Sequence, residues 1–216
     1  IKIASETIFI YAPLAHRMGL YNIKSELDDL SLKYTKPEEY YEVEKKLQET
    51  KEEREEYIDD FSNLLTERLE EEGIEFEIKG RSKSVYSIHK KMRSQQINFE
   101  EVYDKFAVRI IYRSDLRNEK FLAWKIYSIV TDIFRPNPKR LRDWISQPKS
   151  TGYEALHITV MGPMARWVEV QIRSERMDEL AERGVAAHYK YKENYQVEDS
   201  KVDEWISQVR EMLENN

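Results

Sequence analysis

The chain has 216 residues, of which 40% are hydrophobic and 12% aromatic, so it is long enough to bury a sizeable core. The absence of cysteine excludes disulfides and cysteine-ligated metals, and no apolar run approaches the roughly 18 residues of a membrane-spanning helix. The net charge of −6 conceals an uneven distribution.

Two neighbouring blocks carry opposite charge. Residues 37–77 contain 17 acidic and 5 basic side chains, a net of −12, whereas residues 79–149 contain 17 basic and 7 acidic ones, a net of +10. A basic block inside an acidic protein favours the binding of polyanions. Two solvated faces of opposite charge would give the same pattern, and the charge alone does not decide between them.

The first third of the chain is predicted to be helical. Residues 1–34 form helix with interruptions near Pro13 and Gly19, and residues 35–38 fit a capping box with proline in the first turn of the next helix. Apolar residues over 57–69 recur at helical spacing. The charged stretch before them leaves open one long helix or two.

After Gly73 the pattern changes to strands mixed with helices, typical of an α+β protein with a mostly antiparallel sheet. We therefore expect an N-terminal helical segment over residues 1–72 and a second domain over residues 73–216. Strands are predicted over 74–78, 106–112, 157–161 and 167–173, and helices over 84–92, 120–134, 177–192 and 202–213.

The strand predicted over 167–173 alternates between apolar and polar side chains. Because successive side chains of a strand point to opposite faces, one face should pack on the core and the other should be polar. The core face comprises Val168, Val170 and Ile172, and the polar face comprises Glu169, Gln171 and Arg173. An ordinary exposed face would look the same.

Two carboxylates are candidates for holding a metal ion. Asp104 precedes the apolar strand over 106–112, and Glu169 lies on the strand just described. If these strands are neighbours, the carboxylates converge, which is a general way of holding Mg²⁺ for phosphoryl transfer. A turn aspartate at the start of a strand is the alternative for Asp104.

Residues 79–91 place a glycine, several cations and several hydroxyls around a predicted helix N-terminus. Free N–H groups and the helix dipole make such an end a seat for phosphate, and Lys90 and Lys91 add charge. The spacing is not that of a Walker A loop, and the RNA backbone is an alternative ligand.

A second basic and aromatic stretch runs from Arg140 to His157 and includes Trp144, Lys149 and Tyr153. An aromatic ring near cations can seat a purine that carries phosphates, and Gly152 should leave the ring of Tyr153 accessible. A core tyrosine beside a turn is the alternative. The chain's histidines show no metal-binding spacing with one another.

Taken in order, these segments resemble the synthetase domain of the RelA/SpoT family. The matching segments, within residues 79–192, are GRSKSVYSIHKKM, YDKFAVRI, PKSTGYEALH, VEVQIRS and ELAERGVAAHYKYK. Residues 11–41 resemble the segment that joins the family's hydrolase and synthetase domains. The chain is therefore interpreted as a piece of a longer cytoplasmic protein.

The resemblance implies a nucleotidyltransferase-like fold, with a mixed five-stranded sheet between helices. It also implies an Mg²⁺-dependent enzyme that transfers pyrophosphate from ATP to the 3′-hydroxyl of GDP or GTP, in the stringent response. No membrane or direct nucleic-acid partner is expected, and any ribosome or tRNA contact would come from other regions of the parent. A catalytically silent guanine-nucleotide or RNA-binding module, or another nucleotidyltransferase, remains open.

The resemblance also assigns roles to residues. Asp104 and Glu169 match the metal and catalytic carboxylates. Residues matching the ATP site are Arg81, Lys83, Ser87, Lys91 and Arg109, with Arg81 and Arg109 flanking the adenine. Residues matching the GDP or GTP site are Arg142, Lys149, Tyr153, His157 and Gln171, with Tyr153 stacking on guanine.

Three positions depart from the family pattern. Thr151 stands where asparagine is usual, Ser82 replaces a proline and should loosen the donor loop, and Glu154 replaces a common glutamine. The Arg140-x-Arg142-Asp143 pattern resembles that of members with a hydrolase, which implies a bifunctional parent.

Overall fold

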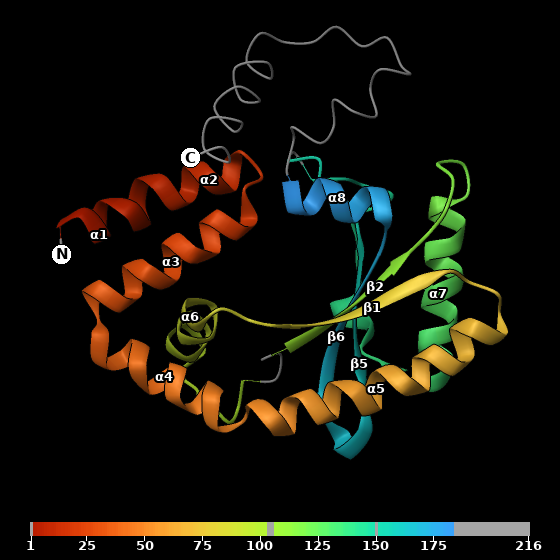
Figure 1. Cartoon of the computed structure of the whole chain (residues 1–216), viewed down its shortest axis with the longest axis horizontal. Coiled ribbons are helices and arrows are strands. Elements are labelled where there is room, and N and C mark those ends of the chain that lie inside the picture. The colour runs from red at the N-terminus through yellow and green to blue at the C-terminus, as the bar shows by residue number, and fades with distance from the viewer. Residues whose placement is uncertain (1, 103–105, 150, 184–216) are drawn as a thin grey trace, which may run out of the picture.

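The computed structural model describes residues 2–102, 106–149 and 151–183. Six consecutive helical elements precede the first strand: α1 (Lys2–Glu6), the π-helix η1 (Thr7–Tyr11), α2 (Ala12–Arg17), α3 (Tyr21–Thr35), α4 (Pro37–Glu49) and α5 (Lys51–Glu71). In Figure 1 they run from red to orange, with α3 folded back beside α2 and α5 extended along the sheet.

Local chemistry accounts for the breaks between these helices. The π-helix ends two residues before Pro13, whose missing N–H disturbs the regular α ladder, and Gly19 turns the chain with φ +74°. Thr50 separates α4 from α5, so the charged stretch contains two helices. The expected capping box is wrong, because the hydroxyl of Thr35 donates to the Ser31 carbonyl within α3 and Lys36 caps α4 without a side-chain bond.

The sheet is mixed, as predicted. Its strands are β1 (Phe76–Ser82), β2 (Phe106–Tyr112), β3 (Arg135–Pro136), β4 (Arg142–Asp143), β5 (Leu156–Met161) and β6 (Trp167–Ser174). The order is β1-β2-β6-β5-β3, and only β2 and β6 are parallel among these pairs. A sixth strand joins the expected five because the two-residue β4 also pairs with β5.

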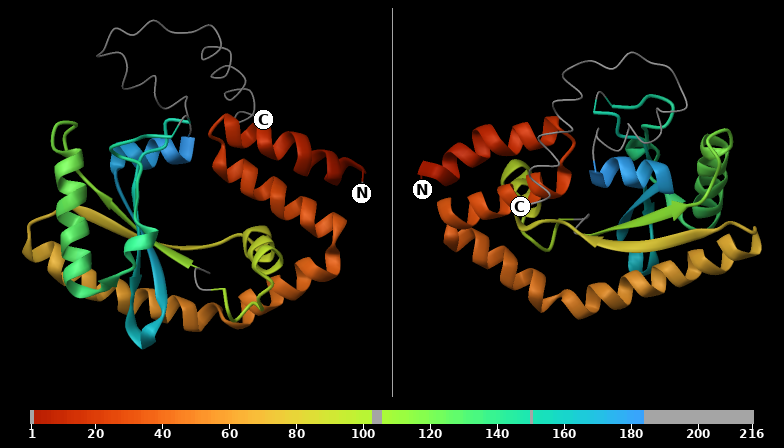
Figure 2. Two further views of the ribbon diagram at one scale, coloured as in Figure 1. Left: turned by 180° about the vertical axis from the view of Figure 1, so that it is seen from behind. Right: turned by 45° about the horizontal axis from the view of Figure 1, so that its top comes forward.

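One face of this sheet forms the main core. Val108, Val170 and Ile172 are completely or almost completely buried and pack with side chains of α5 and of α7 (Glu119–Ile133). Burial of each such side chain stabilises the fold by about 1.5–3 kcal/mol. The predicted alternation of β6 is therefore confirmed on its apolar side, and Figure 2 shows α5 and α7 from two further directions.

A second, smaller core joins α3 and α4 to α6 (Val85–Gln95), and comprises Leu32, Tyr40, Val43, Leu47, Val85, Ile88, Phe99 and Val102. At its edge His89 pairs with Glu39, which also contacts Arg93. Burial opposes ionisation of Glu39, but these hydrogen bonds hold its pKa at about 2. Helix α6 is thus attached to the N-terminal helices on one side and continues directly from β1 on the other.

The last described helix, α8 (Glu175–Arg183), contacts β2 and β6. The helix predicted over 202–213, and the end of the one predicted over 177–192, lie outside the described residues. In the described part of the chain, no helix has the length and apolar character needed to cross a bilayer.

Candidate active site

The face of the sheet opposite the main core is polar, and strand pairing concentrates charge on it. One row crosses five strands through Lys79, Arg109, Gln171, His157 and Arg142. The adjacent row on this face contains Arg81, Ala107, Glu169 and Thr159. Segments far apart in sequence therefore present their functional side chains to one surface.

Glu169 lies in the middle of this face. Its Oε1 accepts a hydrogen bond of 2.8 Å from Nε2 of Gln171, and its Oε2 lies 3.8 Å from Nζ of Lys83. Nδ1 of His157 is 3.6 Å from Oε1. These contacts bring one predicted catalytic residue together with predicted residues of both nucleotide sites.

Strand β2, which follows Asp104 in sequence, and strand β6, which carries Glu169, are neighbours, as the convergence argument required. Ala107 of β2 is paired with Glu169 of β6. Asp104, three positions earlier in sequence, lies outside the described residues, so its meeting with Glu169 stays a prediction. Within the described ranges, no group of three or more potential metal-ligating side chains is placed to hold an ion.

A cavity of about 450 Å³ lies between β1, α6 and α3. The predicted ATP residues Arg81, Lys83, Ser87 and Lys91 all line it, together with Ser25, Ser82, Ser84, Ala107 and Gln171. We refer to it as the donor cavity. Apart from Ala107 and Gln171, its side chains are cations and hydroxyls, which suit a polyphosphate.

The N-terminus of α6 beside this cavity is not the open phosphate seat that the sequence suggested. The N–H of Tyr86 donates to Oδ1 of Asp29 at 2.7 Å, and the N–H of Ser87 donates to the capping Oγ of Ser84 at 3.3 Å. Side chains occupy these donors because unpaired N–H groups at a helix end are costly. Lys83 and Lys91 remain at the cavity wall.

A second cavity, of about 270 Å³, adjoins the first and shares Ser25, Arg81 and Gln171 with it. We refer to it as the acceptor cavity. Lys149, Tyr153, His157 and Gln171, all predicted for the acceptor nucleotide, line it together with residues of α2, α3, β6 and α8.

Two predicted site residues are placed differently from the rest of their groups. Arg109, assigned to ATP, lines the acceptor cavity and not the donor cavity. Arg142 lines neither of the two, because its side chain is exposed and its Nη1 donates to the carbonyls of Lys139 and Leu141. The shared row on the sheet brings the backbone of Arg142 to the site but not its guanidinium.

Tyr153 is half-buried, so its ring is less accessible than the sequence suggested. Its hydroxyl is 2.7 Å from Nε2 of His157, and Nζ of Lys149 lies 5.0 Å from its ring centre. Gly152 provides the preceding turn with φ +75°. Burial, with a smaller contribution from nearby cations, lowers the pKa of His157 to about 4, so its imidazole is uncharged at neutral pH.

Two buried arginines extend the cationic surface under α8. Nη1 of Arg109 donates to Asp178 at 3.2 Å and to Glu182 at 2.9 Å. Nε of Arg173 lies 2.9 Å from Oδ1 of Asp178, but the angle between them is not that of a hydrogen bond. Among the described residues, this buried nitrogen has no hydrogen-bond partner. Acidic side chains of α8 therefore neutralise cations on the floor of the acceptor cavity.

Sequence reasoning missed the contribution of the N-terminal helices. His16, Tyr21, Asn22 and Lys24 line the acceptor cavity, and Ser25 lines both cavities. Their only sequence signal is that polar positions 21, 25 and 29 recur on one helical face, which is equally typical of a solvated surface.

Each departure from the family pattern has a partner in the structure. Oγ of Ser82 accepts a hydrogen bond from Nη1 of Arg54 at 3.1 Å, which ties the donor segment to α5 where a looser loop was expected. Thr151 is 2.9 Å from the Tyr21 hydroxyl. Glu154 accepts from Arg176 at 2.7 Å.

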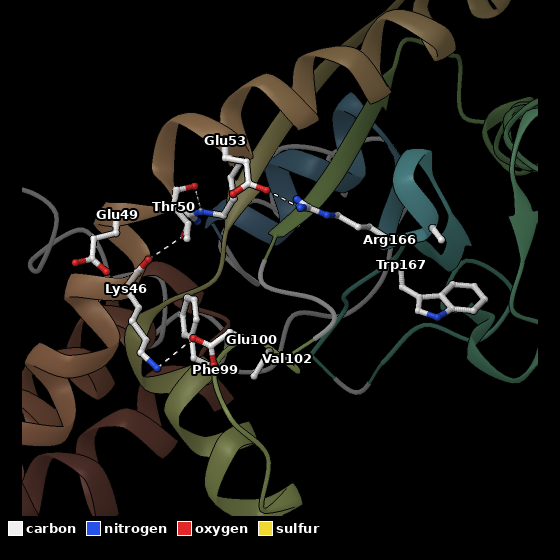
Figure 3. A pocket seen from close by; sticks show the side chains of 11 residues that line it. Lys46, Glu49, Thr50, Glu53, Phe99, Glu100, Val102, Arg166 and Trp167 are labelled. Atoms are coloured by element: carbon white, nitrogen blue, oxygen red, sulfur yellow. Dashed lines mark hydrogen bonds and ion pairs between the residues drawn. The ribbon is translucent and has the colours of Figure 1, made fainter.

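A separate cavity of about 510 Å³ lies where α4 meets α5, and Figure 3 shows residues that line it. Arg166 pairs with Glu53 at 2.5 Å, and Lys46 pairs with Glu100 at 3.2 Å. Charges of both signs are paired here, and none of the predicted nucleotide-binding residues lines this cavity.

Comparison with known proteins decides the family. Residues 80–196 match a family model described as "Region found in RelA / SpoT proteins", which is more than half of the chain. The chain belongs to the RelA/SpoT family. The match includes most of the strands and cavity residues described above, so the resemblance seen in the sequence is confirmed.

RelA/SpoT relatives match over nearly the whole chain. A "GTP pyrophosphokinase" of Myxococcus xanthus is 44% identical over 213 residues, which cover 99% of this chain and 27% of that protein. The "Bifunctional (p)ppGpp synthase/hydrolase SpoT" of Escherichia coli is 35% identical over 217 residues, covering 99% of this chain and 30% of that protein. The chain thus spans less than a third of these relatives.

Solved structures of small alarmone synthetases are more distant. Synthetase 2 of Bacillus subtilis has 23% sequence identity and a TM-score of 0.49, covering 80% of this chain and 92% of that one. Synthetase 1 bound to its product pppGpp has 23% identity and a TM-score of 0.44, covering 81% and 92%. Similarity at this level adds nothing to the family assignment.

Proposed function

We propose that this chain transfers pyrophosphate from ATP to the 3′-hydroxyl of GDP or GTP and releases AMP. The observation that carries the proposal is that two cavities adjoin and that Glu169, which lines neither, contacts Lys83 of the donor cavity, His157 of the acceptor cavity and Gln171 of both. One is lined by cations and hydroxyls and the other by an aromatic ring with cations, and they share Gln171. Two nucleotides bound there would meet next to a carboxylate.

The donor cavity is suited to the triphosphate of ATP. Arg81, Lys83 and Lys91 offer positive charge from β1 and α6, and Ser87 offers a hydroxyl. Charge-assisted hydrogen bonds to phosphate are about twice as strong as neutral ones. In this proposal these cations hold the β- and γ-phosphates toward Glu169, and Arg109, in the adjoining cavity, contacts the adenine from the acceptor side.

The acceptor cavity is suited to a guanine nucleotide. The ring of Tyr153 seats the base, Lys149 neutralises phosphate, and His157 and Gln171 provide polar contacts toward the ribose. The neutral His157 adds no charge there, which leaves charge recognition to Lys149. Arg142 would take part only if its exposed side chain turned toward the ligand.

The proposed reaction is an in-line displacement at the β-phosphorus of ATP. A bond forms between the acceptor 3′-oxygen and the β-phosphorus, and the bond from that phosphorus to the oxygen it shares with the α-phosphate breaks. AMP leaves with this oxygen. In this proposal Glu169 takes the hydroxyl proton, since its Oε1 contacts Gln171, which lines both cavities, and His157 of the acceptor cavity.

A divalent cation fits the donor set. Glu169 offers carboxylate oxygens, and Asp104 precedes Ala107, the strand neighbour of Glu169. Hard cations such as Mg²⁺ take oxygen ligands from one or two carboxylates together with substrate phosphates. When bound, Mg²⁺ would offset the charge on the phosphates. The remaining work of this chain's residues is positioning.

The proposal extends to the rest of the chain. In this proposal residues 73–216 form the synthetase unit and residues 1–72 a helical segment whose α5 packs against the sheet of that unit. The protein would act in the cytoplasm, where its substrates ATP and GDP are available. Relatives named as hydrolases share this region, so an inactive nucleotide-binding module is the second candidate.

Product analysis tests the proposal. The chain is incubated with ATP, GDP and Mg²⁺, and the nucleotides are separated and identified. Equimolar AMP and ppGpp are expected. Binding of GDP without AMP would favour the silent module, and release of free pyrophosphate would indicate another nucleotidyltransferase.

A further inference from the structure

Helix α3 touches three separate segments of the candidate active site. The hydroxyl of Tyr21 is 2.9 Å from Oγ1 of Thr151, in the turn that leads to Tyr153. Nδ2 of Asn22 donates to Glu182 of α8 at 2.9 Å. One further contact of the same helix, from Asp29, reaches the start of α6.

The contact at α6 concerns the donor side. Oδ1 of Asp29 accepts the N–H of Tyr86 at 2.7 Å, in the first turn of the helix that carries Ser87 and Lys91. Positions 21, 25 and 29 follow the helical repeat and lie on one face. Between the two ends of this face, Ser25 lines both cavities.

The contact of Tyr21 concerns the acceptor side. Its ring lies edge-on to that of Tyr153, with centres 6.1 Å apart, and Tyr153 in turn bonds His157. The Thr151–Gly152 turn sets where the Tyr153 ring stands, because Gly152 has a positive φ there. Holding Thr151 therefore holds the ring that would seat the acceptor base.

We propose that helix α3 is a wall of the active site that positions both nucleotides, with Tyr21 positioning the acceptor and Asp29 positioning the donor. This inference rests on the proposed function. Asp29 lines neither cavity and Tyr21 lines the acceptor cavity beside Tyr153, and in this proposal each acts through a neighbour, Tyr21 through Thr151 and Asp29 through α6. Their effects should separate by substrate, which a general loss of packing would not do.

A double-mutant cycle tests the acceptor half. Tyr21→Phe and Thr151→Val each remove one hydroxyl and should raise the KM for GDP about three- to tenfold, the scale of one hydrogen bond. The KM for ATP should change less than twofold. The double variant should be no worse than either single one, because the two groups form one interaction. Thr151→Ser keeps the hydroxyl, so its KM for GDP should stay close to that of the parent.

Substitutions of Asp29 should change the KM for ATP and not that for GDP, which is the reverse of the result expected for Tyr21. Asp29→Ala should raise the KM for ATP and leave that for GDP unchanged. Asp29→Asn keeps one oxygen that can accept the Tyr86 N–H but loses part of the contacts with Val85 and Ser84, so its KM for ATP should lie between those of the parent and of Asp29→Ala. Tyr34→Phe, on the same helix with 66% of the side chain exposed, is the matched control and should behave as the parent. Melting temperatures of all variants are measured alongside.

Equal increases in both KM values for Tyr21→Phe, or additive effects in the cycle, would overturn the inference while leaving the proposed function intact. If the parent made no ppGpp, the proposed function would fail on its own. The same variants would then be titrated with GDP and with a non-hydrolysable ATP analogue. A loss confined to GDP for Tyr21→Phe and to the ATP analogue for Asp29→Ala would still support the inference, and any other pattern would reject it.

Discussion

The donor and acceptor cavities are built in different ways. The donor cavity takes most of its lining from one continuous segment, residues 81–91, which forms the end of β1 and the start of α6. The acceptor cavity gathers α2, α3, β2, β5, β6, α8 and the turn before β5. A site made from one segment can be found in sequence, whereas a site assembled from many depends on tertiary contacts.

Burial follows the same division. Lys83 and Lys91 at the donor cavity are half-buried, while Arg109 and Arg173 at the acceptor cavity are 8% and 1% exposed. The buried arginines need the carboxylates of Asp178 and Glu182, because an unpaired buried charge is strongly destabilising. We therefore expect donor-side mutations to affect binding with little effect on folding, and acceptor-side mutations to affect both more often.

The largest expected effect lies at the junction, where the two cavities cannot be separated. Glu169→Gln keeps the side-chain volume and should leave the melting temperature near that of the parent. If Glu169 accepts the hydroxyl proton, turnover should fall about 10²- to 10⁴-fold at saturating substrates. Single-turnover formation of ppGpp measures this, and Asp104→Asn should behave in the same way. Retention of more than about a tenth of the parent rate would make the carboxylate structural.

Removing one donor cation should give the next largest effect and should be specific to ATP. Lys83→Met keeps the aliphatic length but removes the ammonium group that lies 3.8 Å from Glu169. Loss of one charged hydrogen bond predicts a fall in kcat/KM for ATP of about 10- to 100-fold. Lys79→Met is the matched control, since Lys79 lies on β1, the strand that ends just before Lys83, and lines neither cavity. An equal loss in both variants would point to the general field of the basic block.

Substitutions of Tyr153 test the acceptor cavity in the same way. Tyr153→Ala should weaken GDP by about five- to a hundredfold, the range for a lost base–aromatic stack, with little change for ATP. Tyr153→Phe keeps the ring and loses only the bond to His157, so its effect should be much smaller. Steady-state KM values for both substrates measure this. If Phe were as damaging as Ala, the hydroxyl would matter more than the ring.

The difference between a cavity built from one segment and a cavity built from many explains how much could be predicted from the sequence. The alternation of β6 predicted which of its side chains face the core and which lie on the same face as Glu169, because strand periodicity is a local property. The position of Arg109 could not be predicted in the same way. Its residue type suited either nucleotide, and only the pairing of β2 with β6 and the packing of α8 place it at the acceptor cavity.

The helix ends illustrate the same limit. The segment before α6 contained the correct cap, Ser84, but nothing in it indicated that Asp29 would bind the N–H of Tyr86 from a helix 57 positions away. In the same way, the sequence around Thr35 fits a capping box, but in the structure its hydroxyl donates to the Ser31 carbonyl. A short polar side chain can bond to several backbone groups with similar energy, and the tertiary structure determines which of these groups lies close enough.

The remaining expected effect is on stability and not on turnover, and it distinguishes a buried acceptor site from an exposed one. Burial lowers the folded pKa of His157 to about 4 from 6.5, so between these values the unfolded chain binds more protons than the folded chain. The contribution of His157 to stability is therefore complete above pH 6.5 and is lost as pH falls toward 4, by at most about 1.4 kcal/mol per pH unit. The carboxylate of Glu169 opposes part of this loss, whereas Lys149 and Arg173 add to it.

Denaturant unfolding of the parent and of His157→Gln from pH 7 to 4.5 measures the difference, and the variant should show the flatter curve of stability against pH. Parallel curves would mean that water reaches the imidazole, and that the acceptor cavity is as open as the donor cavity.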